Sequence, residues 1–161
     1  MTIAASEQTR QTMTKHGTIL LIEGDAEQTL LVKKAFLEVE VGYSVQSVNN
    51  TGDAVKYLGG DAIYANRASF PVPFLVLLDL RLPGEGGFAV LRWLYERPGL
   101  RKRFPVVVWS SADPEQDIQL AYELGAQSFL IRPSEYKALT VTVRGIKDYW
   151  IGLNVLPGDI L

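Results

Sequence analysis

The sequence predicts a three-layer α/β fold, in which a doubly wound parallel sheet lies between two layers of helices. Short apolar runs alternate five times with segments of helical length along the chain. Segments of that length do not form tight hairpins, so successive strands should run parallel and be joined by right-handed crossovers. The runs at 74–78 and 105–109 suit strands that helices cover on both faces. We therefore predict a (βα)5 domain at residues 18–154.

The predicted strands are short, and each is followed by polar or turn-forming residues. The third strand stops abruptly at Asp79 and the fourth is closed by Ser110. The second strand alternates in polarity, whereas the others are mostly apolar. The predicted strands span residues 19–22, 43–48, 74–78, 105–109 and 127–131.

Apolar spacing and capping residues define five helices between and after these strands. The first helix has apolar residues at helical spacing, which include Leu30 and Leu37. Thr51 is the expected cap of the second helix, and Asp113 with Pro114 forms a favourable start for the fourth. The predicted helices span residues 26–39, 51–58, 86–97, 113–124 and 136–153.

Two short segments flank the predicted domain. Residues 1–17 are rich in Thr, Gln and Ser without periodicity and are expected to form a flexible arm, while 155–161 form a tail. The polar start of the chain lacks the apolar stretch of a signal peptide, and no run approaches the ~18 apolar residues of a membrane span. We therefore expect a cytoplasmic protein that is not bound to a membrane.

Composition excludes several kinds of site. The 161 residues include no cysteine and a single histidine, His16, so disulfides, thiolate zinc sites and multi-histidine metal sites are ruled out. With 16 basic and 18 acidic residues the net charge is −2, which argues against a broad surface for nucleic acid or anionic lipid. Hydrophobic residues make up 47% of the chain, which is enough for a substantial core.

Acids, a hydroxyl and a cation follow the predicted strands. They are Glu23, Asp25, Asp79, Ser110 and Arg132. In a doubly wound sheet the functional groups lie outside the carboxyl ends of the strands, so these side chains should meet. Singly, an aspartate after a strand is more often a turn or cap residue, and the serine could cap the next helix. Together they favour capture of a phosphoryl group.

Asp79 is the expected nucleophile of this site. It ends a strand predicted to be deeply buried, where its ionised form requires a nearby cation, for which Arg132 is available. A carboxylate can accept a phosphoryl group as an acyl phosphate. Mg²⁺ usually neutralises the transferred group while it is held by carboxylates, and Glu23 and Asp25 are the available acids.

Four motifs occur in the order ILLIEGD, LVLLDLRLPGEGGF, VVVWSSAD and GAQSFLIRPSE. Together they resemble the receiver domains of two-component response regulators, over about residues 18–154. The long loop at 59–73 and the ending YWIGLN are most similar to the stand-alone receivers paired with bacterial phytochromes. The resemblance implies the flavodoxin-like strand order 2-1-3-4-5 and a histidine kinase, such as a phytochrome, as partner.

The resemblance also assigns roles to matching positions. Asp79 matches the phosphoacceptor, and Ser110 and Phe129 match the switch hydroxyl and the switch aromatic residue. Arg132 stands at the position of the family's lysine, which contacts the phosphoryl group. Glu23 matches the first acid of the metal-binding pair.

Two of these positions depart from the family pattern. Gly24 stands where the second acid binds the metal, and Asp25 lies one place later, on the same side as Glu23 if the strand stays extended. Arg132 has a flat, forked donor in place of a compact ammonium and could hold Asp79 itself. A weakened Mg²⁺ site is therefore expected. Its predicted ligands are Glu23, Asp25, Asp79 and Arg81.

Two backbone features accompany this resemblance. Pro133 matches a position at which the family uses a cis peptide, and we predict one here. Gly84, Gly86 and Gly87 should allow a sharp turn after Pro83. We prefer that interpretation to a phosphate-binding loop, because no G-x-x-x-x-G-K-[ST] motif is present.

Two functions stay open at this point. The first is a single-domain response regulator, not an enzyme, that takes a phosphoryl group from a histidine kinase. The second is a pseudo-receiver, which keeps the fold and partner surface without phosphorylation. A phosphatase would require an acid at the position of Arg81, and a DNA-binding output would require another domain. The last helix is more apolar than one buried face requires, through residues such as Tyr149 and Trp150, so we also predict a homodimer.

Overall fold

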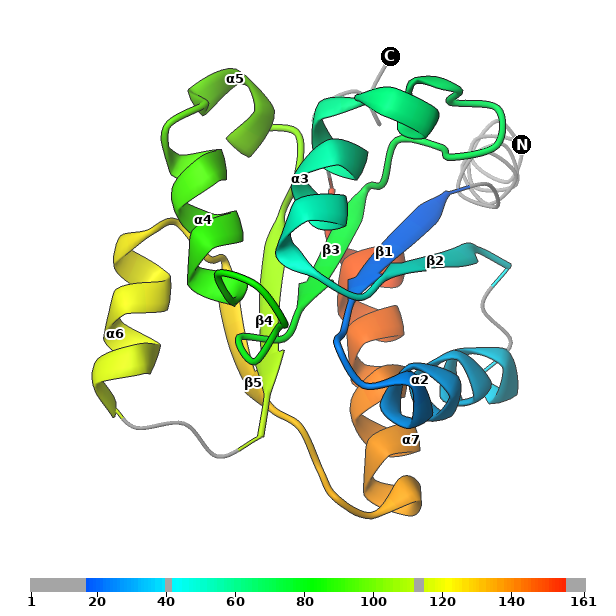
Figure 1. Ribbon diagram of the computed structural model, residues 1–161. Helices are drawn as coiled ribbons and strands as arrows, with labels where there is room; N and C mark the ends of the chain where they lie inside the picture. The colour runs from blue at the N-terminus through cyan, green and yellow to red at the C-terminus, as the bar shows by residue number, and fades with distance from the viewer. Residues whose placement is uncertain (1–16, 40–41, 112–114, 156–161) are drawn as a thin grey trace, which may run out of the picture.

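The computed structural model describes residues 17–39, 42–111 and 115–155, which form a five-stranded parallel sheet flanked by helices (Figure 1). The strand order is β2-β1-β3-β4-β5, so the flavodoxin-like fold and order that the sequence predicts are confirmed. The strands are β1 (Thr18–Ile22), β2 (Ser44–Val48), β3 (Leu75–Leu78), β4 (Val106–Ser110) and β5 (Ser128–Ile131).

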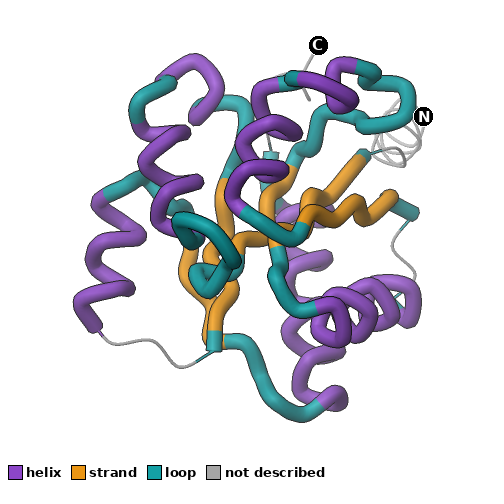
Figure 2. Tube along the Cα trace, in the orientation of Figure 1, coloured by secondary structure: helices purple, strands orange, loops and turns teal. Residues whose placement is uncertain are grey.

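Helices cover both faces of the sheet, which gives the three layers (Figure 2). One face packs against α3, α4 and α6, and the other packs against α2 and α7. A 3₁₀ turn, η1 (Ala62–Ala65), lies in the loop after α3, and a π-helical segment, η2 (Lys147–Leu153), extends α7. The helices are α2 (Ala26–Glu38), α3 (Thr51–Gly59), α4 (Gly87–Tyr95), α5 (Pro98–Arg101), α6 (Glu115–Glu123) and α7 (Tyr136–Ile146).

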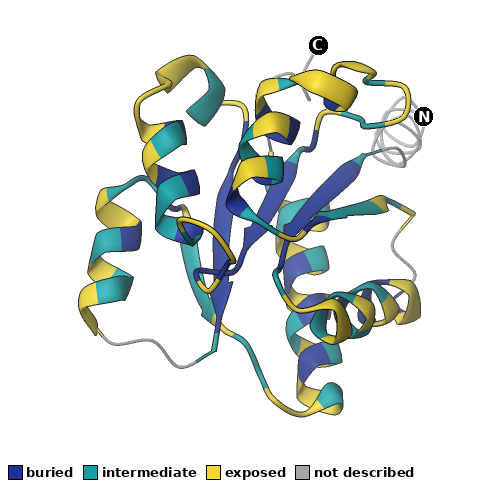
Figure 3. Ribbon diagram, viewed as in Figure 1, coloured by how far each residue is buried: buried dark blue, intermediate teal, exposed yellow. Residues whose placement is uncertain are grey.

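Burial separates the inner strands from the edge strands (Figure 3). Every residue of β1, β3 and β4 is buried, as expected of apolar strands between two helical layers. The edge strands β2 and β5 are mostly half-buried. The inner strands therefore hold the residues that follow them in fixed positions at the carboxyl edge of the sheet.

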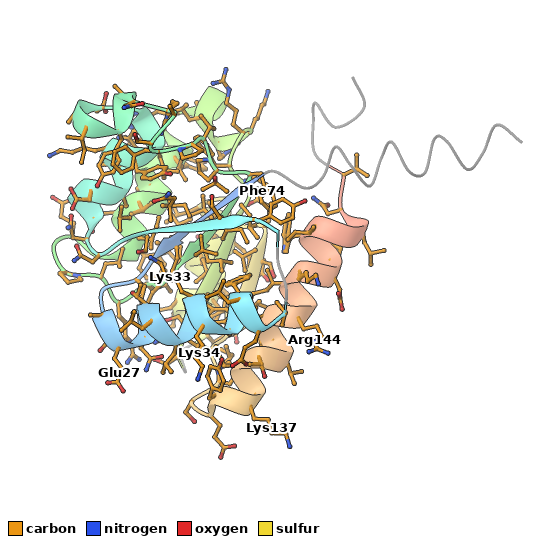
Figure 4. All side chains as sticks on the ribbon, turned by 90° about the vertical axis from the view of Figure 1, so that its right-hand side faces the viewer. Glu27, Lys33, Lys34, Phe74, Lys137 and Arg144 are labelled. Carbon is orange, nitrogen blue, oxygen red and sulfur yellow. The ribbon has the colours of Figure 1, made fainter. Side chains whose placement is uncertain are left out.

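Helices α2 and α7 lie side by side on one face (Figure 4). The Lys34 ammonium of α2 lies 4.9 Å from the ring centroid of Tyr136 in α7, a cation–π contact between the two helices. Beneath them, Trp109 of β4 is fully buried. The next residue of β4, Ser110, is at the carboxyl end of the strand.

Only some of the apolar residues that indicate helix α2 in the sequence are buried. Leu30 and Leu37 are 69% and 76% exposed, whereas Val32, Ala35 and Phe36 are buried against the sheet. Apolar residues occur around much of this helix, so more than one face satisfies the helical spacing. Packing against the sheet selects one of them.

Other element boundaries also differ from the predictions. Pro98 begins the short helix α5 where the sequence predicts only the end of a helix, because proline is well suited to the first helical position. The predicted final helix is divided into α7 and η2. The predicted cap at Asp113 and Pro114, and nearly all of the predicted arm and tail, lie outside the described residues. Among the described residues, no helix is long and apolar enough to span a bilayer.

Candidate functional site

The parallel strands bring the predicted functional groups to one edge of the sheet. Asp79 follows β3, and its backbone N–H donates to the carbonyl oxygen of Ile22 in β1 (3.0 Å). Arg132 follows β5, and its backbone N–H donates to the carbonyl oxygen of Ser110 in β4 (2.8 Å). Backbone hydrogen bonding thus extends one residue past β3 and past β5. It fixes the backbone positions of Asp79 and Arg132.

The Asp79 carboxylate is buried and contacts three groups. Its Oδ1 accepts hydrogen bonds from the Ser110 hydroxyl (3.3 Å) and from the backbone N–H of Arg81 (3.0 Å). Its Oδ2 lies 3.8 Å from Nη1 of Arg132. The acid, hydroxyl and guanidinium that the sequence indicates therefore lie close together at the carboxyl edge of the sheet.

Arg132 makes its closest contact with Glu23 rather than with Asp79. Nη1 of the guanidinium donates to Glu23 Oε2 in a buried ion pair. The other oxygen, Oε1, accepts a hydrogen bond from the backbone N–H of Asp25 (3.1 Å). One guanidinium therefore lies beside both buried carboxylates of the site and neutralises them in part.

The pKa of Glu23 is raised above its ordinary value of 4.5. Burial is the largest cause, because it penalises the charged form, and the neighbouring charge of Asp79 acts in the same direction. The backbone N–H of Asp25 and the Arg132 guanidinium oppose the shift without cancelling it. The site therefore holds its two acids close together against the cost of burial and mutual repulsion.

Gly24 is closely covered by the loop after β3. A Cβ atom at this position would lie 2.6 Å from Cδ of Pro83, closer than nonbonded carbon atoms approach, and 3.5 Å from the Arg81 carbonyl oxygen. The Asp25 side chain is exposed and caps α2, accepting a hydrogen bond from the Gln28 N–H (2.9 Å). The carboxylate that the sequence offers as a replacement ligand thus serves as a helix cap.

The loop after β3 is a sharp turn, as the sequence predicts. Gly84 and Gly86 have positive φ angles of 91° and 82°, which other residues rarely adopt. Thr51 fixes this turn by donating from its hydroxyl to the Gly86 carbonyl oxygen (3.0 Å), a role that the sequence does not reveal. The N-cap of α3 is Asn50, not Thr51 as predicted, because the asparagine side chain reaches the N–H of Asp53 (2.8 Å).

The two remaining predicted features lie in β5 and directly after it. The backbone N–H of Phe129 donates to the Tyr122 hydroxyl of α6 (3.1 Å), and the Phe129 ring packs against the core on that face. The bond between Arg132 and Pro133 is trans, so the predicted cis peptide is wrong. Trans is the ordinary preference of X–Pro bonds, and nothing in the local sequence requires the other isomer.

Comparison with protein families matches residues 19–144 to the response regulator receiver domain. The chain belongs to this family. The receiver is 33% identical over 145 residues to the probable methanogenesis regulatory protein FilR2 of Methanothrix harundinacea, with 87% of each chain covered. It is 32% identical over 139 residues to response regulator Rcp1 of Synechocystis, covering 86% of this chain and 92% of Rcp1.

Two solved structures resemble the receiver closely. The phosphorylated cyanobacterial phytochrome response regulator RcpA has a TM-score of 0.81 and 31% identity, over 89% of this chain and 99% of that one. The Mn²⁺-bound form of Rcp1 has a TM-score of 0.79 and 30% identity, over 88% and 99% of the two chains. The predicted resemblance to phytochrome-associated receivers is confirmed, and the chain is a receiver-domain protein of two-component signalling.

The donor set of this receiver does not fit a divalent cation as it stands. Gly24 supplies no carboxylate, Asp25 caps a helix, and Glu23 is paired with Arg132. Within the described part of the chain, no three His, Asp or Glu side chains form a group that could hold a metal. A cation at Asp79 would have to displace the guanidinium from Glu23 or do without that acid.

Proposed function

We propose that this receiver is a single-domain response regulator whose Asp79 accepts a phosphoryl group from a histidine kinase. The observation that supports this most directly is the contact of the buried Asp79 carboxylate with Ser110 and its 3.8 Å approach to Arg132 at the carboxyl edge of the sheet. A hydroxyl and a guanidinium are suitable partners for phosphoryl oxygens. Similarity to the phosphorylated RcpA over 89% of the chain supports the same role.

The transfer step follows from the two oxygens of Asp79. Oδ1 is held by the Arg81 N–H and the Ser110 hydroxyl, while Oδ2 faces Arg132. Oδ2 would attack the phosphorus atom, forming an O–P bond as the P–N bond to the kinase histidine breaks. The electron pair of that bond remains on the imidazole nitrogen, and the guanidinium offsets the charge of the transferred group.

We propose a phytochrome-type histidine kinase as the donor. This rests on the similarity to RcpA, which is a phytochrome response regulator, and on the coverage of nearly its whole chain. Phosphorylation would act through Ser110 and Phe129, which lie on the adjacent strands β4 and β5. The signal would be a changed surface around α6, β5 and α7.

Intact mass tests the phosphoacceptor directly. The protein is incubated with acetyl phosphate in excess Mg²⁺, so that a metal requirement cannot hide the reaction, beside an Asp79→Asn variant. We expect an added mass of one phosphoryl group on the wild type and none on the variant. An unmodified wild type under these conditions, and also with a cognate kinase, would contradict the proposal.

A second function, phosphorylation-independent binding, is favoured by the region around Gly24. The Pro83 ring covers this position, and Arg132 is already paired with Glu23. Such a pseudo-receiver would bind its partner equally well as wild type and as the Asp79→Asn variant. Partner binding measured for both proteins, before and after treatment with acetyl phosphate, separates the two functions.

We also propose a homodimer through the carboxyl-terminal helical region. Leu139, Val143 and Ile146 are buried against the sheet, but Val141 and Leu153 remain 68% and 75% exposed. In the proposed dimer these two side chains would be covered by the second copy. Light scattering should give twice the chain mass for wild type. The double variant Val141→Glu and Leu153→Glu should have the mass of a single chain. A wild type that remains monomeric at high concentration would contradict the proposed dimer.

A further inference from the structure

The cation of this site is part of the chain. The Arg132 guanidinium is ion-paired with Glu23 Oε2 and lies 3.8 Å from Asp79 Oδ2, so it stands between the two buried acids. Its backbone is fixed as well, because the Arg132 N–H donates to Ser110 of β4. Two carboxylates that share one nearby cation form the arrangement in which a bound divalent ion is otherwise expected.

The remaining oxygens of the two acids already have donors. Glu23 Oε1 accepts from the Asp25 N–H, and Asp79 Oδ1 accepts from Ser110 and from the Arg81 N–H. A metal ion would therefore have to displace the guanidinium. It would also have to give up tightly bound water molecules in exchange for only a few available carboxylate oxygens.

The loop after β3 closes the position from which another ligand would come. A Cβ atom of residue 24 would lie only 2.6 Å from Pro83 Cδ. The Thr51 hydroxyl holds the same loop through Gly86. The packing of this loop therefore requires glycine at position 24, and an acidic side chain would not fit there without movement of the loop.

We propose that the Arg132 guanidinium takes the place of the divalent cation, so that this receiver binds neither Mg²⁺ nor Mn²⁺ at Asp79 and needs neither for phosphoryl transfer. The part that concerns transfer rests on the proposed function, whereas the part that concerns metal binding does not. Guanidinium suits this task because it stays charged, is weakly hydrated and presents several N–H donors to carboxylate and phosphoryl oxygens.

Transfer of the phosphoryl group fits this arrangement. As the O–P bond to Asp79 Oδ2 forms, the bond from phosphorus to the donor breaks and its electron pair stays with the leaving group, so the anionic oxygens of the transferred phosphoryl group come to lie beside Arg132. The guanidinium can donate to them from one nitrogen while another remains near Glu23. The positive charge is thus present before the phosphoryl group arrives and does not have to be recruited from solution.

Calorimetric titration with Mn²⁺ and with Mg²⁺ tests the metal-binding half. Wild type should show no saturable binding, whereas Arg132→Met and Arg132→Gln should gain it, because Glu23 and Asp79 are then free to act as ligands. Arg103→Met, which removes an exposed arginine, is the matched control and should behave as wild type. Two different replacements guard against one that fails to fold.

Two results would overturn this half. Saturable binding by wild type that Glu23→Gln abolishes would show that the guanidinium does not occupy the place of a cation. Absence of binding by wild type and by both folded Arg132 variants would show that the guanidinium is not what excludes the metal.

Phosphoryl transfer from acetyl phosphate tests the other half. The initial rate for wild type should be the same with EDTA as with Mg²⁺, and the metal-free rate should fall by about 100-fold in Arg132→Met, as when one preorganised charge-stabilising donor is removed. A wild-type reaction that EDTA abolishes would overturn the proposal. If no adduct forms in either solution the proposed function fails, and the titrations still decide whether Arg132 replaces the metal.

Discussion

Two arginine–carboxylate pairs in this receiver differ chiefly in their exposure to water. On the surface near α5, Arg97 Nη1 lies 3.8 Å from Glu96, and the two side chains are 43% and 72% exposed. At the carboxyl edge of the sheet, Arg132 and Glu23 are 12% and 1% exposed. Water therefore stabilises the charges of the surface pair, whereas in the buried pair each charge is stabilised mainly by its partner.

The fold depends on the buried charges more than on the exposed ones. Arg97 has alternatives, since it also donates to the Trp93 carbonyl oxygen and stacks over the Trp93 ring at 4.4 Å. Water would replace Glu96 at little cost in free energy. Removal of Arg132 would leave the charges of Glu23 and Asp79 buried without their neighbouring cation.

Loss of the buried guanidinium should have the largest effect. We expect Arg132→Met to lower the free energy of unfolding by about 3–5 kcal/mol at neutral pH, as is typical when one member of a buried ion pair is removed. Urea denaturation measures this directly. A loss no larger than that for an exposed arginine such as Arg103 would show that water, rather than Arg132, compensates the two buried carboxylates.

A side chain at position 24 should have the next largest effect. Gly24→Asp is expected to destabilise the protein by about 1–3 kcal/mol, because its Cβ meets the Pro83 ring. Gly24→Ala is the matched control: it adds the Cβ without the charge and should be similarly destabilised. Thermal unfolding in which Gly24→Ala melts with wild type would contradict the close contact with Pro83.

The pKa of Glu23 gives a smaller, pH-dependent effect. Because burial raises this pKa above 4.5 in the folded state, the folded protein holds the proton more tightly, and this stabilisation is present below pH 4.5 and lost as pH rises through the raised pKa. A glutamine at position 23 does not titrate, so Glu23→Gln does not lose this stabilisation. The variant should therefore become more stable relative to wild type as pH rises.

Urea denaturation at a series of pH values checks this trend. Glu27→Gln, which changes an exposed glutamate of α2, is the control and should follow wild type (Figure 4). Parallel stability profiles for Glu23→Gln and wild type would contradict the raised pKa. They would show that the folded and unfolded states bind the Glu23 proton equally well.

The surface pair should give the smallest effect. Glu96→Gln is expected to change the free energy of unfolding by less than about 0.5 kcal/mol, because both members of the pair are solvated. The small change should shrink further in high salt. A loss comparable with that of Arg132→Met would remove the distinction between the two regions.

The sheet could be predicted well because its signal is local. Apolar runs such as 74–78 are too short for most helices and are bounded by polar residues, and every inner strand was found where such a run occurs. Helix faces were harder, since α2 carries apolar residues on several sides and only packing selects Val32 over Leu30. Asn50 and Thr51 are both good caps, and the choice depends on backbone geometry.

Convergence at the carboxyl edge could likewise be predicted, because parallel strands align their ends. The partner of Arg132 could not: Glu23 and Asp79 are both acids at adjacent strand ends, and a distance decides between them. The cover over Gly24 depends on the path of the loop through Pro83, which Thr51 fixes from another element. Contacts of this kind have no signature in a single sequence.

A crystal structure of the receiver grown in Mn²⁺, with anomalous scattering collected at the manganese edge, would show whether the Arg132 guanidinium stands in the place of a metal ion. We expect no anomalous peak between Glu23 and Asp79, with the Arg132 guanidinium still paired to Glu23. A peak bound by both carboxylates, with the guanidinium turned away, would contradict it.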